Sequence, residues 1–306
     1  MQCSYNSTEC QISIVIPVQV MTTSFEINAV KDLRVSFVVV DDGSSEECYE
    51  NLRNKFVSLD NVTLIRQIHK GAGAARNAGI KAAKGKYIYF LDADDNFVGA
   101  EILLKMADIA ERENADIVGG SMKEIRQDGS VFSEWQGFDK KFVFEKEGWI
   151  DYKDYQYDYG FYRFLYRRDF LSENKLFFSN LKRFQDPPFF VRCMLKAEKF
   201  FAIKETTYIY NVHPTQYTLE KTRDLLKGII YNLYLSRKNG LDELHFTTVI
   251  RLYRDFFDFV FPYRKKCLFL LFVIKLLLNK AVMEKFSDTS EYAIYKKNKF
   301  FSNGLL

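Results

Sequence analysis

The chain has 306 residues, enough for one full hydrophobic core and a smaller appendage. Apolar residues make up 47% and charged residues 27%, which excludes an intrinsically disordered chain. The formal charge of +4 is too small to indicate nucleic-acid binding, and we expect none. The 29 Phe and 19 Tyr residues favour a heavily packed core, a carbohydrate-contacting cleft or a membrane-facing surface.

The cysteines and the N-terminal residues indicate the cellular compartment of the protein. Five cysteines are scattered along the chain, and none has the short paired spacing of a zinc site or a redox motif. This pattern favours reduced thiols. Residues 1–11 are polar and lack the hydrophobic segment of a signal peptide. We therefore expect a cytoplasmic protein.

Short apolar runs alternate with helical patterns in the first 120 residues. Strands are predicted at 12–16, 36–40, 62–65, 87–91 and, more briefly, 116–118. Helices are predicted at 74–83 and 102–110. The first strand is expected to end at Pro17, because proline cannot donate to a central ladder. The alternation predicts an α/β fold with a mostly parallel sheet flanked by helices.

The pattern changes after residue 119. Residues 145–170 are rich in Trp, Tyr and Phe, and a helix is predicted to begin in the segment 184–190 and reach Lys199. From Leu219 onward the periodicity is helical, which predicts a C-terminal helical extension.

Two clusters of carboxylates follow predicted strands. Asp41 and Asp42 come after 36–40, and residues 92–95 (Asp-Ala-Asp-Asp) come after 87–91. Taken singly, such a cluster is more often a turn with a helix cap. Ligands of open α/β sheets bind beyond the carboxyl ends of the strands, however, and both clusters are expected at that edge. Together they favour a site for a hard divalent cation and the phosphates it binds.

The segment 70–77 (KGAGAARN) lies between these clusters. Its two glycines let the backbone approach a ligand, and the following helix offers its N-terminus to an anion. Arg76 could neutralise a phosphate or stack on a base. The segment does not match the dinucleotide-binding fingerprint, because Arg76 occupies the place of the third glycine. The alternative interpretation is an ordinary helix start with a flexible entry.

Four motifs carry a resemblance to a known family. Residues 13–17 (SIVIP), 39–44 (VVDDGS), 75–80 (ARNAGI) and 89–95 (YFLDADD) occur in the order of family 2 glycosyltransferases. Members of this family are inverting, nucleotide-sugar-dependent enzymes of the GT-A (Rossmann-like) fold. Residues 161–171 and 184–190 are similar to the acceptor half of bacterial capsular and cell-surface polysaccharide transferases.

The resemblance implies a domain organisation. Residues 1–218 would form the GT-A domain, with a nucleotide-sugar-binding half at about 11–120 and an acceptor half at 121–218. Residues 219–306 would form the C-terminal helical region.

The resemblance also implies site residues and cofactors. The donor, expected to be a UDP-sugar, would be bound by Pro17, Val18, Asp41, Asp42, Arg76, Asp92 and His213. Mn²⁺ or Mg²⁺ would be held by Asp94 and Asp92, the metal-binding DxD signature. Asp186 would be the general base, with Asp42 on the nucleotide base and His213 near the diphosphate.

Purely structural roles are the alternative for Asp186, for His213 and for the aromatic residues of 145–170. Asp186 followed by Pro187 is also a good helix-capping pair. His213 could be an ordinary structural histidine before a proline. The aromatic residues of 145–170 could stack on acceptor sugars, although packing is the default for most of them. The chain also departs from the family at Gln19 and in the short stretch 20–35, where the first helix is expected to be short or distorted.

The expected function is inverting transfer of a sugar from a nucleotide donor to a hydroxyl of a surface polysaccharide, such as a capsule, or a lipid-linked glycan precursor. The alternatives are a nucleotidyltransferase of related fold and a degenerate scaffold subunit of a glycan-assembly complex. Residues 264–280 form an apolar stretch flanked by Arg and Lys, too short to span a bilayer. It is expected either to lie in the inner face of the plasma membrane or to pack against the core or a partner.

Overall fold

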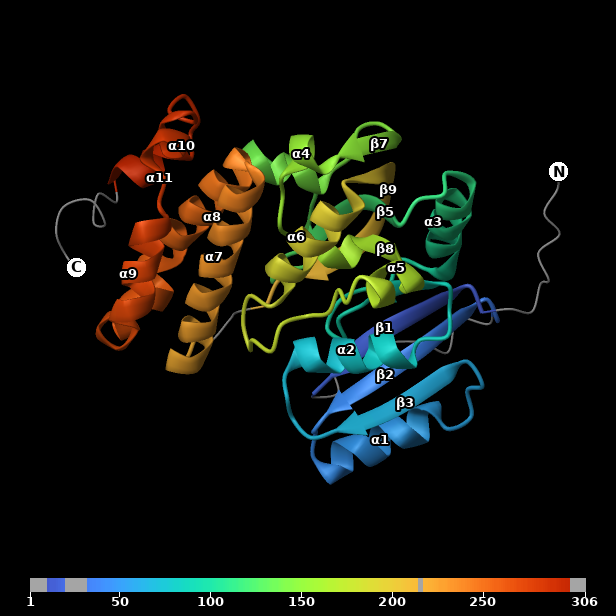
Figure 1. Ribbon diagram of the computed structural model, residues 1–306. Coiled ribbons are helices and arrows are strands. Elements are labelled where there is room, and N and C mark those ends of the chain that lie inside the picture. Colours follow the sequence, from blue (N-terminus) through green and yellow to red (C-terminus); the bar gives the residue numbers. More distant parts are fainter. Residues whose placement is uncertain (1–9, 20–31, 214–216, 298–306) are drawn as a thin grey trace.

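The computed structural model describes residues 10–19, 32–213 and 217–297, and it contains one mixed sheet with helices on its faces (Figure 1). The strand order is β3-β2-β1-β4-β8-β5-β9-β7, and β6 pairs with β5. The strands are β1 (Ile12–Val18), β2 (Val35–Asp42), β3 (Val62–Gln67), β4 (Tyr87–Phe90), β5 (Ile117–Ile125), β6 (Val131–Phe132), β7 (Gly148–Asp151), β8 (Phe164–Arg167) and β9 (Lys199–Asn211). The predicted α/β fold is confirmed.

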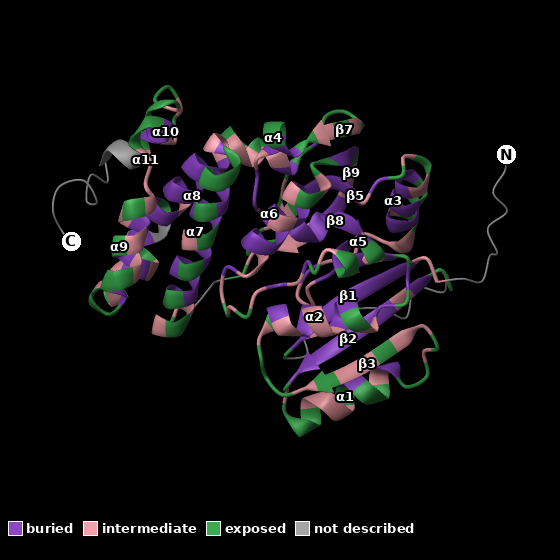
Figure 2. Cartoon of the chain, in the orientation of Figure 1, coloured by how far each residue is buried: buried purple, intermediate pink, exposed green. Residues whose placement is uncertain are grey.

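The first half of the sheet is parallel. β1 pairs in parallel with β2 on one side and β4 on the other, and β2 pairs in parallel with β3. β1 and β2 are almost wholly buried (Figure 2), which explains why both are continuous apolar runs in the sequence. The carboxyl ends of β1, β2 and β4 therefore meet at one edge, as the sequence predicted.

Pro17 does not end the first strand. β1 continues to Val18, with Pro17 opposite Val40 of β2. The pairing of β1 with β4 stops earlier, at Val15 and Phe90. Beyond that point β1 has a strand neighbour on one side only, so a residue without an N–H group is tolerated there.

The second half of the sheet is mixed. β8 is antiparallel to both β4 and β5, β7 is antiparallel to β9, and β5 is parallel to β9. β5 is longer than the short strand predicted at 116–118, because it includes Gly119 and Gly120. A Cβ at Gly119 would lie 2.1 Å from the Phe164 ring, and one at Gly120 would lie 2.1 Å from Thr207. These glycines therefore mark close packing inside a strand, not its end.

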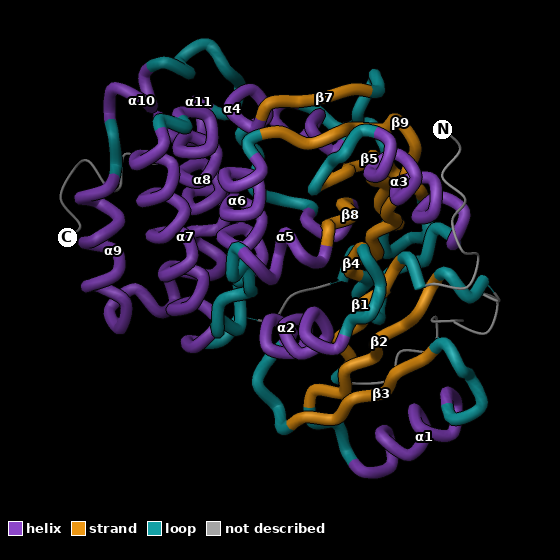
Figure 3. The backbone as a smooth tube through the Cα atoms, turned by 45° about the vertical axis from the view of Figure 1, so that its right-hand side comes forward, coloured by secondary structure: helices purple, strands orange, loops and turns teal. Residues whose placement is uncertain are grey.

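Helices cover the sheet and form the C-terminal region. α2 packs on β1 and β2, and α3 packs on β5 and β9. The tube in Figure 3 shows α7, α8 and α9 together at one side of the sheet. The α-helices are α1 (Glu46–Phe56), α2 (Ala72–Ala82), α3 (Ala100–Arg112), α4 (Tyr152–Tyr155), α5 (Arg168–Glu173), α6 (Asp186–Ala197), α7 (Leu219–Asn239), α8 (Asp242–Asp255), α9 (Leu268–Leu277), α10 (Lys280–Glu284) and α11 (Tyr292–Lys297). Short 3₁₀ or π segments occupy Gly137–Phe142, Phe161–Arg163, Phe256–Val260 and Phe261–Cys267.

The apolar residues gather in two clusters. The larger one fills the space around the sheet, and a smaller one lies among Phe184 and the helices α7 to α11. Most of the aromatic residues of 145–170 belong to the larger cluster, including Tyr152, Tyr155 and Tyr162. The expectation that packing is their default role is therefore met. The division at residues 218 and 219 stays a prediction.

A buried ion pair joins the C-terminal helices to the loop that follows α4. Asp158 is 1% exposed, and its carboxylate accepts two hydrogen bonds from the Arg251 guanidinium, at 2.7 and 2.9 Å. Asn232 Nδ2 donates a third at 2.7 Å. The charge of Asp158 thus depends on partners supplied by α7 and α8.

Replacing Arg251 with Met is expected to lower the free energy of unfolding by about 3–5 kcal/mol, because it leaves the Asp158 carboxylate buried without its cation. The measurement is urea unfolding of the purified chain. Arg53→Met is the matched control, since Arg53 pairs with Glu50 on the exposed face of α1. It should cost less than about 1 kcal/mol. Equal losses for both variants would contradict the importance of the buried pair.

Candidate active site

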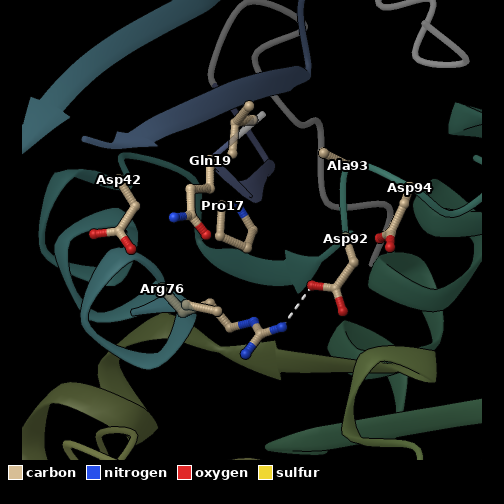
Figure 4. Close-up of a pocket in the computed structure, with 9 residues that line it drawn as sticks. Pro17, Gln19, Asp42, Arg76, Asp92, Ala93 and Asp94 are labelled. Carbon is tan, nitrogen blue, oxygen red and sulfur yellow. Dashed lines mark hydrogen bonds and ion pairs between the residues drawn. The ribbon is translucent and has the colours of Figure 1, made fainter. Parts of the chain in front are cut away.

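A pocket of about 360 Å³ opens at the carboxyl ends of β1, β2 and β4. It brings together six of the nine residues assigned from the sequence. Figure 4 shows Asp42 at one end of the pocket, Asp94 at the other, and the side chains of Arg76 and Asp92 facing each other between them. The pocket is lined by Pro17, Val18, Gln19, Asp42, Ala72, Arg76, Asp92, Ala93 and Asp94.

Asp42 organises the loop that leads into α2. The side chain is almost fully buried, and its carboxylate accepts hydrogen bonds from the backbone N–H groups of Lys70 (2.8 Å) and Gly71 (2.7 Å). Gln67 Nε2 donates at 2.7 Å, and His69 Nδ1 lies 2.9 Å away. Asp42 thereby fixes the position of the N-terminus of α2 at the pocket wall.

Gly71, at the N-cap of α2, has φ 93°, a backbone conformation that favours glycine. A Cβ there would meet no atom within 4 Å, so the requirement comes from the backbone and not from space. α2 starts two residues before the helix predicted at 74–83, since Gly73 lies in its first turn.

Asp41 does not line the pocket. Successive side chains of a strand point to opposite faces, and Asp41 lies on the other side of β2 from Asp42. Its carboxylate accepts a hydrogen bond from the Ser44 N–H at 3.2 Å and lies 3.4 Å from Arg66 Nε. The structure therefore places this carboxylate in the turn after β2, away from the other predicted donor-binding residues.

Arg76 is a buried cation at the centre of the pocket wall. Its Nη2 atom donates to Asp92 Oδ1 at 2.6 Å, and its guanidinium lies over the rings of Phe161 and Phe178. The Nε and Nη1 atoms are buried and have no hydrogen-bond partner. The nearby Asp92 carboxylate raises the pKa of Arg76 against the opposing effect of burial, so the side chain stays charged.

The carboxylates after β4 have different surroundings. Asp92 is paired with Arg76, whereas Asp94 is about half exposed, and burial and the Asp92 charge raise its pKa. Asp95 is buried and accepts hydrogen bonds from the Tyr208 hydroxyl (2.5 Å) and the Asn211 N–H (2.7 Å). Burial and Asp92 raise the pKa of Asp95 to about 8. Asp95 thus ties this loop to β9, a role that the sequence pattern did not separate from those of its neighbours.

His213 follows β9 and reaches the same end of the pocket. Its Nε2 atom lies 3.7 Å from Asp94 Oδ2, and both side chains are about half exposed. Asn211 Nδ2 donates to the Asp94 carbonyl at 2.6 Å, which holds the two segments together. The sequence assignment of His213 to the diphosphate end is compatible with this position.

The residues near Asp94 fit a divalent cation. Among the described residues, no three His, Cys, Asp or Glu side chains converge as a complete set of ligands. Mg²⁺ commonly takes only one or two carboxylates from the protein and completes its shell with substrate phosphates and water. Burial and the Asp92 charge raise the pKa of Asp94 although His213 and Arg76 act in the opposite direction, so ionising this carboxyl group has a cost that its neighbours do not fully offset. A cation there would relieve that cost, with Asp94 and Asp92 as the protein ligands.

Asp186 is the first residue of α6, and the N-cap position belongs to Gln185. Asp186 therefore lies in the first turn of the helix, beside Pro187, and not at the N-cap. Burial raises the pKa of Asp186, and the nearby charges of Arg76 and Arg183 oppose that shift. Asp186 does not line the pocket. It lies close enough to Arg76, a lining residue, for the charge of Arg76 to lower its pKa.

Sequence reasoning missed three residues that line the pocket. Gln19 was noticed only as a departure from the family pattern, although its place two residues after Pro17 at a strand end was a usable signal. Ala72 and Ala93 contribute small side chains next to assigned residues. The expectation of a short or distorted first helix falls largely on residues 20–31, which lie outside the described residues.

Comparison with known proteins supports this picture. Residues 24–174 match the model of glycosyl transferase family 2. The chain is 29% identical over 189 residues to the uncharacterized glycosyltransferase EpsJ of Bacillus subtilis, an alignment covering 60% of this chain and 54% of the relative. It is 31% identical over 185 residues to the poly(ribitol-phosphate) beta-glucosyltransferase of Bacillus spizizenii, covering 57% of this chain and 27% of the relative.

A solved structure extends the likeness to nearly the whole chain. TarS 1–349 of S. aureus, in complex with UDP-GlcNAc, aligns with a TM-score of 0.71 at 15% identity, over 95% of this chain and 92% of that one. The fold and the sequence matches together define a glycosyltransferase of the GT-A type. The chain belongs to glycosyltransferase family 2 and is similar to transferases of bacterial cell-surface polysaccharides.

Proposed function

We propose that this glycosyltransferase moves a sugar, with inversion, from a UDP-sugar to a hydroxyl of a surface polysaccharide or a lipid-linked glycan precursor. The observation that carries the proposal is the pocket itself. A buried arginine with unsatisfied N–H groups and a solvent-facing carboxylate meet at the carboxyl ends of three parallel strands. This combination suits a ligand that carries a diphosphate and a cation.

The residues assigned from the sequence at and beside the pocket have roles in the proposed reaction. Pro17, Val18 and the loop held by Asp42 would bind the uridine, and Arg76 would lie alongside the diphosphate. His213 would close the donor site. A bound Mn²⁺ or Mg²⁺, held by Asp94 and Asp92, would stabilise the charge that develops on the departing diphosphate.

Asp186 would be the general base. The acceptor hydroxyl is a weak nucleophile and must lose its proton as it attacks. A carboxylate on the face of the sugar opposite the leaving group would accept that proton, and attack from that face inverts the anomeric centre. Burial raises the pKa of Asp186, and the charges of Arg76 and Arg183 oppose that rise, which favours the ionised form that a base requires.

The acceptor class is inferred from the relatives. One of them is named for transfer to poly(ribitol-phosphate), and another, of Bacillus subtilis, for minor teichoic acid biosynthesis. Both names refer to surface polymers, so a surface polymer or its precursor is the acceptor we propose. The chain spans about half or less of the length of these relatives.

A thermal-shift screen of nucleotide-sugars with and without Mn²⁺ tests the donor. A UDP-sugar at 100 times its Kd should stabilise the fold by about 2.7 kcal/mol, because it binds only the folded state. The same sugars linked to GDP, and UDP-sugars with EDTA, are the controls. Release of pyrophosphate from a nucleoside triphosphate and a sugar phosphate would favour the nucleotidyltransferase instead. No shift with any donor would favour a scaffold.

A further inference from the structure

The helix α9 is apolar on two opposite faces, yet only one of them is packed. Leu271 and Ile274 are buried in the smaller hydrophobic cluster, and the helix contacts α7. On the other face Phe269 is 75% exposed and Leu276 62% exposed, with Phe272 and Leu268 both at 49%. Figure 2 shows this exposed surface on α9. A helix that is apolar all round is normally buried on all sides, so this face is expected to have a partner.

The exposed apolar residues form a continuous stripe. Phe269, Phe272 and Leu276 are spaced by three and four residues, which puts them on one face of the helix. Lys265, four residues before Phe269, is exposed in the 3₁₀ segment that leads into α9 and adds a positive charge at this end of the helix. The stripe is thus a row of large apolar side chains that begins at a basic end.

The charges within the segment that carries the stripe have one sign. Residues 264–280 contain five basic residues (Arg264, Lys265, Lys266, Lys275 and Lys280) and no acidic residue. Lys265 and Lys266 are exposed just before the helix, whereas Lys280 follows its end and pairs with Glu284 at 3.6 Å. A basic rim around an apolar stripe is complementary to an anionic surface with an apolar interior.

The neighbouring helix α7 adds a second row of side chains. Tyr231 and Tyr234 are 40% and 49% exposed, and the ammonium group of Lys238 lies 5.9 Å from the Tyr234 ring centre. Arg237 Nη1 donates to the Leu276 carbonyl at 3.3 Å, which ties α7 to the end of α9. Tyrosines and lysines are the residues that settle at the boundary between lipid and water.

We infer that α9, with the adjoining residues 264–267, docks the protein onto the surface of a bilayer that contains anionic phospholipid. The stripe of Leu268, Phe269, Phe272 and Leu276 would enter the boundary between headgroups and acyl chains, and the basic residues would contact the headgroup phosphates. A second copy of the chain is a poorer occupant. A two-fold contact through α9 would bring the basic residues of this segment, Lys265 and Lys266 among them, against the same residues of the second copy.

The docking is peripheral. In the described part of the chain, no helix is long and apolar enough to cross a membrane. α9 spans only 10 residues and enters the surface from the side, with its opposite face still packed on the protein.

Vesicle flotation tests this inference with the full chain and needs no sugar transfer. The wild type should float with vesicles made of equal parts phosphatidylglycerol and phosphatidylcholine, and less with phosphatidylcholine alone. Added salt should weaken the binding. The double variant Phe269→Ser/Phe272→Ser should lose about tenfold or more in vesicle affinity. Its matched control, Val57→Ser/Val131→Ser, removes apolar residues that are also exposed but lie outside this face, and it should bind as the wild type.

A charge variant separates docking from folding. Lys265→Glu/Lys266→Glu leaves the packed face of α9 unchanged and should lower affinity for the anionic vesicles about tenfold or more. Lys196→Glu/Lys204→Glu, with two exposed lysines elsewhere, should not. Vesicle binding by the apolar and charge variants equal to the wild type would overturn the inference. The inference would also be overturned if the wild type did not bind vesicles but formed a dimer, and if Phe269→Ser/Phe272→Ser dissociated that dimer.

Discussion

Asp186→Asn should lower kcat for sugar transfer by about 10²–10⁴-fold and leave the affinity for UDP unchanged. The amide has nearly the shape of the carboxylate but cannot accept the proton of the acceptor hydroxyl, and general-base catalysis contributes about that factor. The measurements are steady-state transfer kinetics and UDP binding by calorimetry. The split between kcat and binding separates a base from a residue that merely shapes the pocket.

Asp169→Asn is the matched control for this variant. Asp169 also lies in the first turn of a helix, α5, and its side chain is 66% exposed. Its replacement should leave both kcat and UDP affinity at the wild-type level. Wild-type kcat in Asp186→Asn would remove Asp186 from the proposed mechanism.

The pH profile gives a second check on Asp186. The base works only when it is ionised, so activity should fall as the pH falls through its pKa. Burial raises that pKa above the ordinary value of 3.8. The acid limb of kcat/KM should therefore lie at a higher pH than an exposed aspartate would give, and Asp186→Asn should not show this limb.

Asp94→Asn should lower transfer at least about 100-fold and remove the effect of Mn²⁺ on UDP binding. Asp94 is a half-exposed carboxylate of the pocket, and the Nε2 atom of His213 lies 3.7 Å from its Oδ2 atom. The neutral amide is a poor ligand for a hard cation. The measurement is calorimetry of UDP binding with Mn²⁺ and with EDTA, beside the transfer assay.

Asp60→Asn controls for the loss of one negative charge, since Asp60 is exposed in the loop before β3. Its UDP binding should respond to Mn²⁺ as the wild type does. A wild-type response in Asp94→Asn would show that this carboxylate does not hold the cation, whatever the fate of the other assignments.

The parallel half of the sheet could be predicted from the sequence because each of its strands is marked by its own short run of residues. β1, β2 and β4 are buried on both faces and therefore appear as short, unbroken apolar runs. The acidic residues that follow β2 and β4 mark the shared carboxyl edge. For this reason the positions of Asp42, Asp92 and Asp94 in one pocket could be anticipated.

The mixed half depends on contacts between distant residues. Gly119 and Gly120 interrupt the apolar run of β5, yet they are there to admit Phe164 and Thr207 from other strands. Sequence periodicity cannot register such a contact. The same limit applies to Asp41 and Asp95, which sit beside assigned residues in the chain but bond to the Ser44 backbone and to Tyr208.

The ion pair between Asp158 and Arg251 has a consequence for how the protein can be divided. A fragment ending at residue 218 would retain every side chain of the proposed active site. The carboxylate of Asp158 would nevertheless lose its hydrogen-bond partners Arg251 and Asn232. The side chain of Phe184, two residues before Asp186, would lose the C-terminal helices that bury it. Residues 1–218 and the C-terminal helices are therefore expected to fold and unfold as one unit.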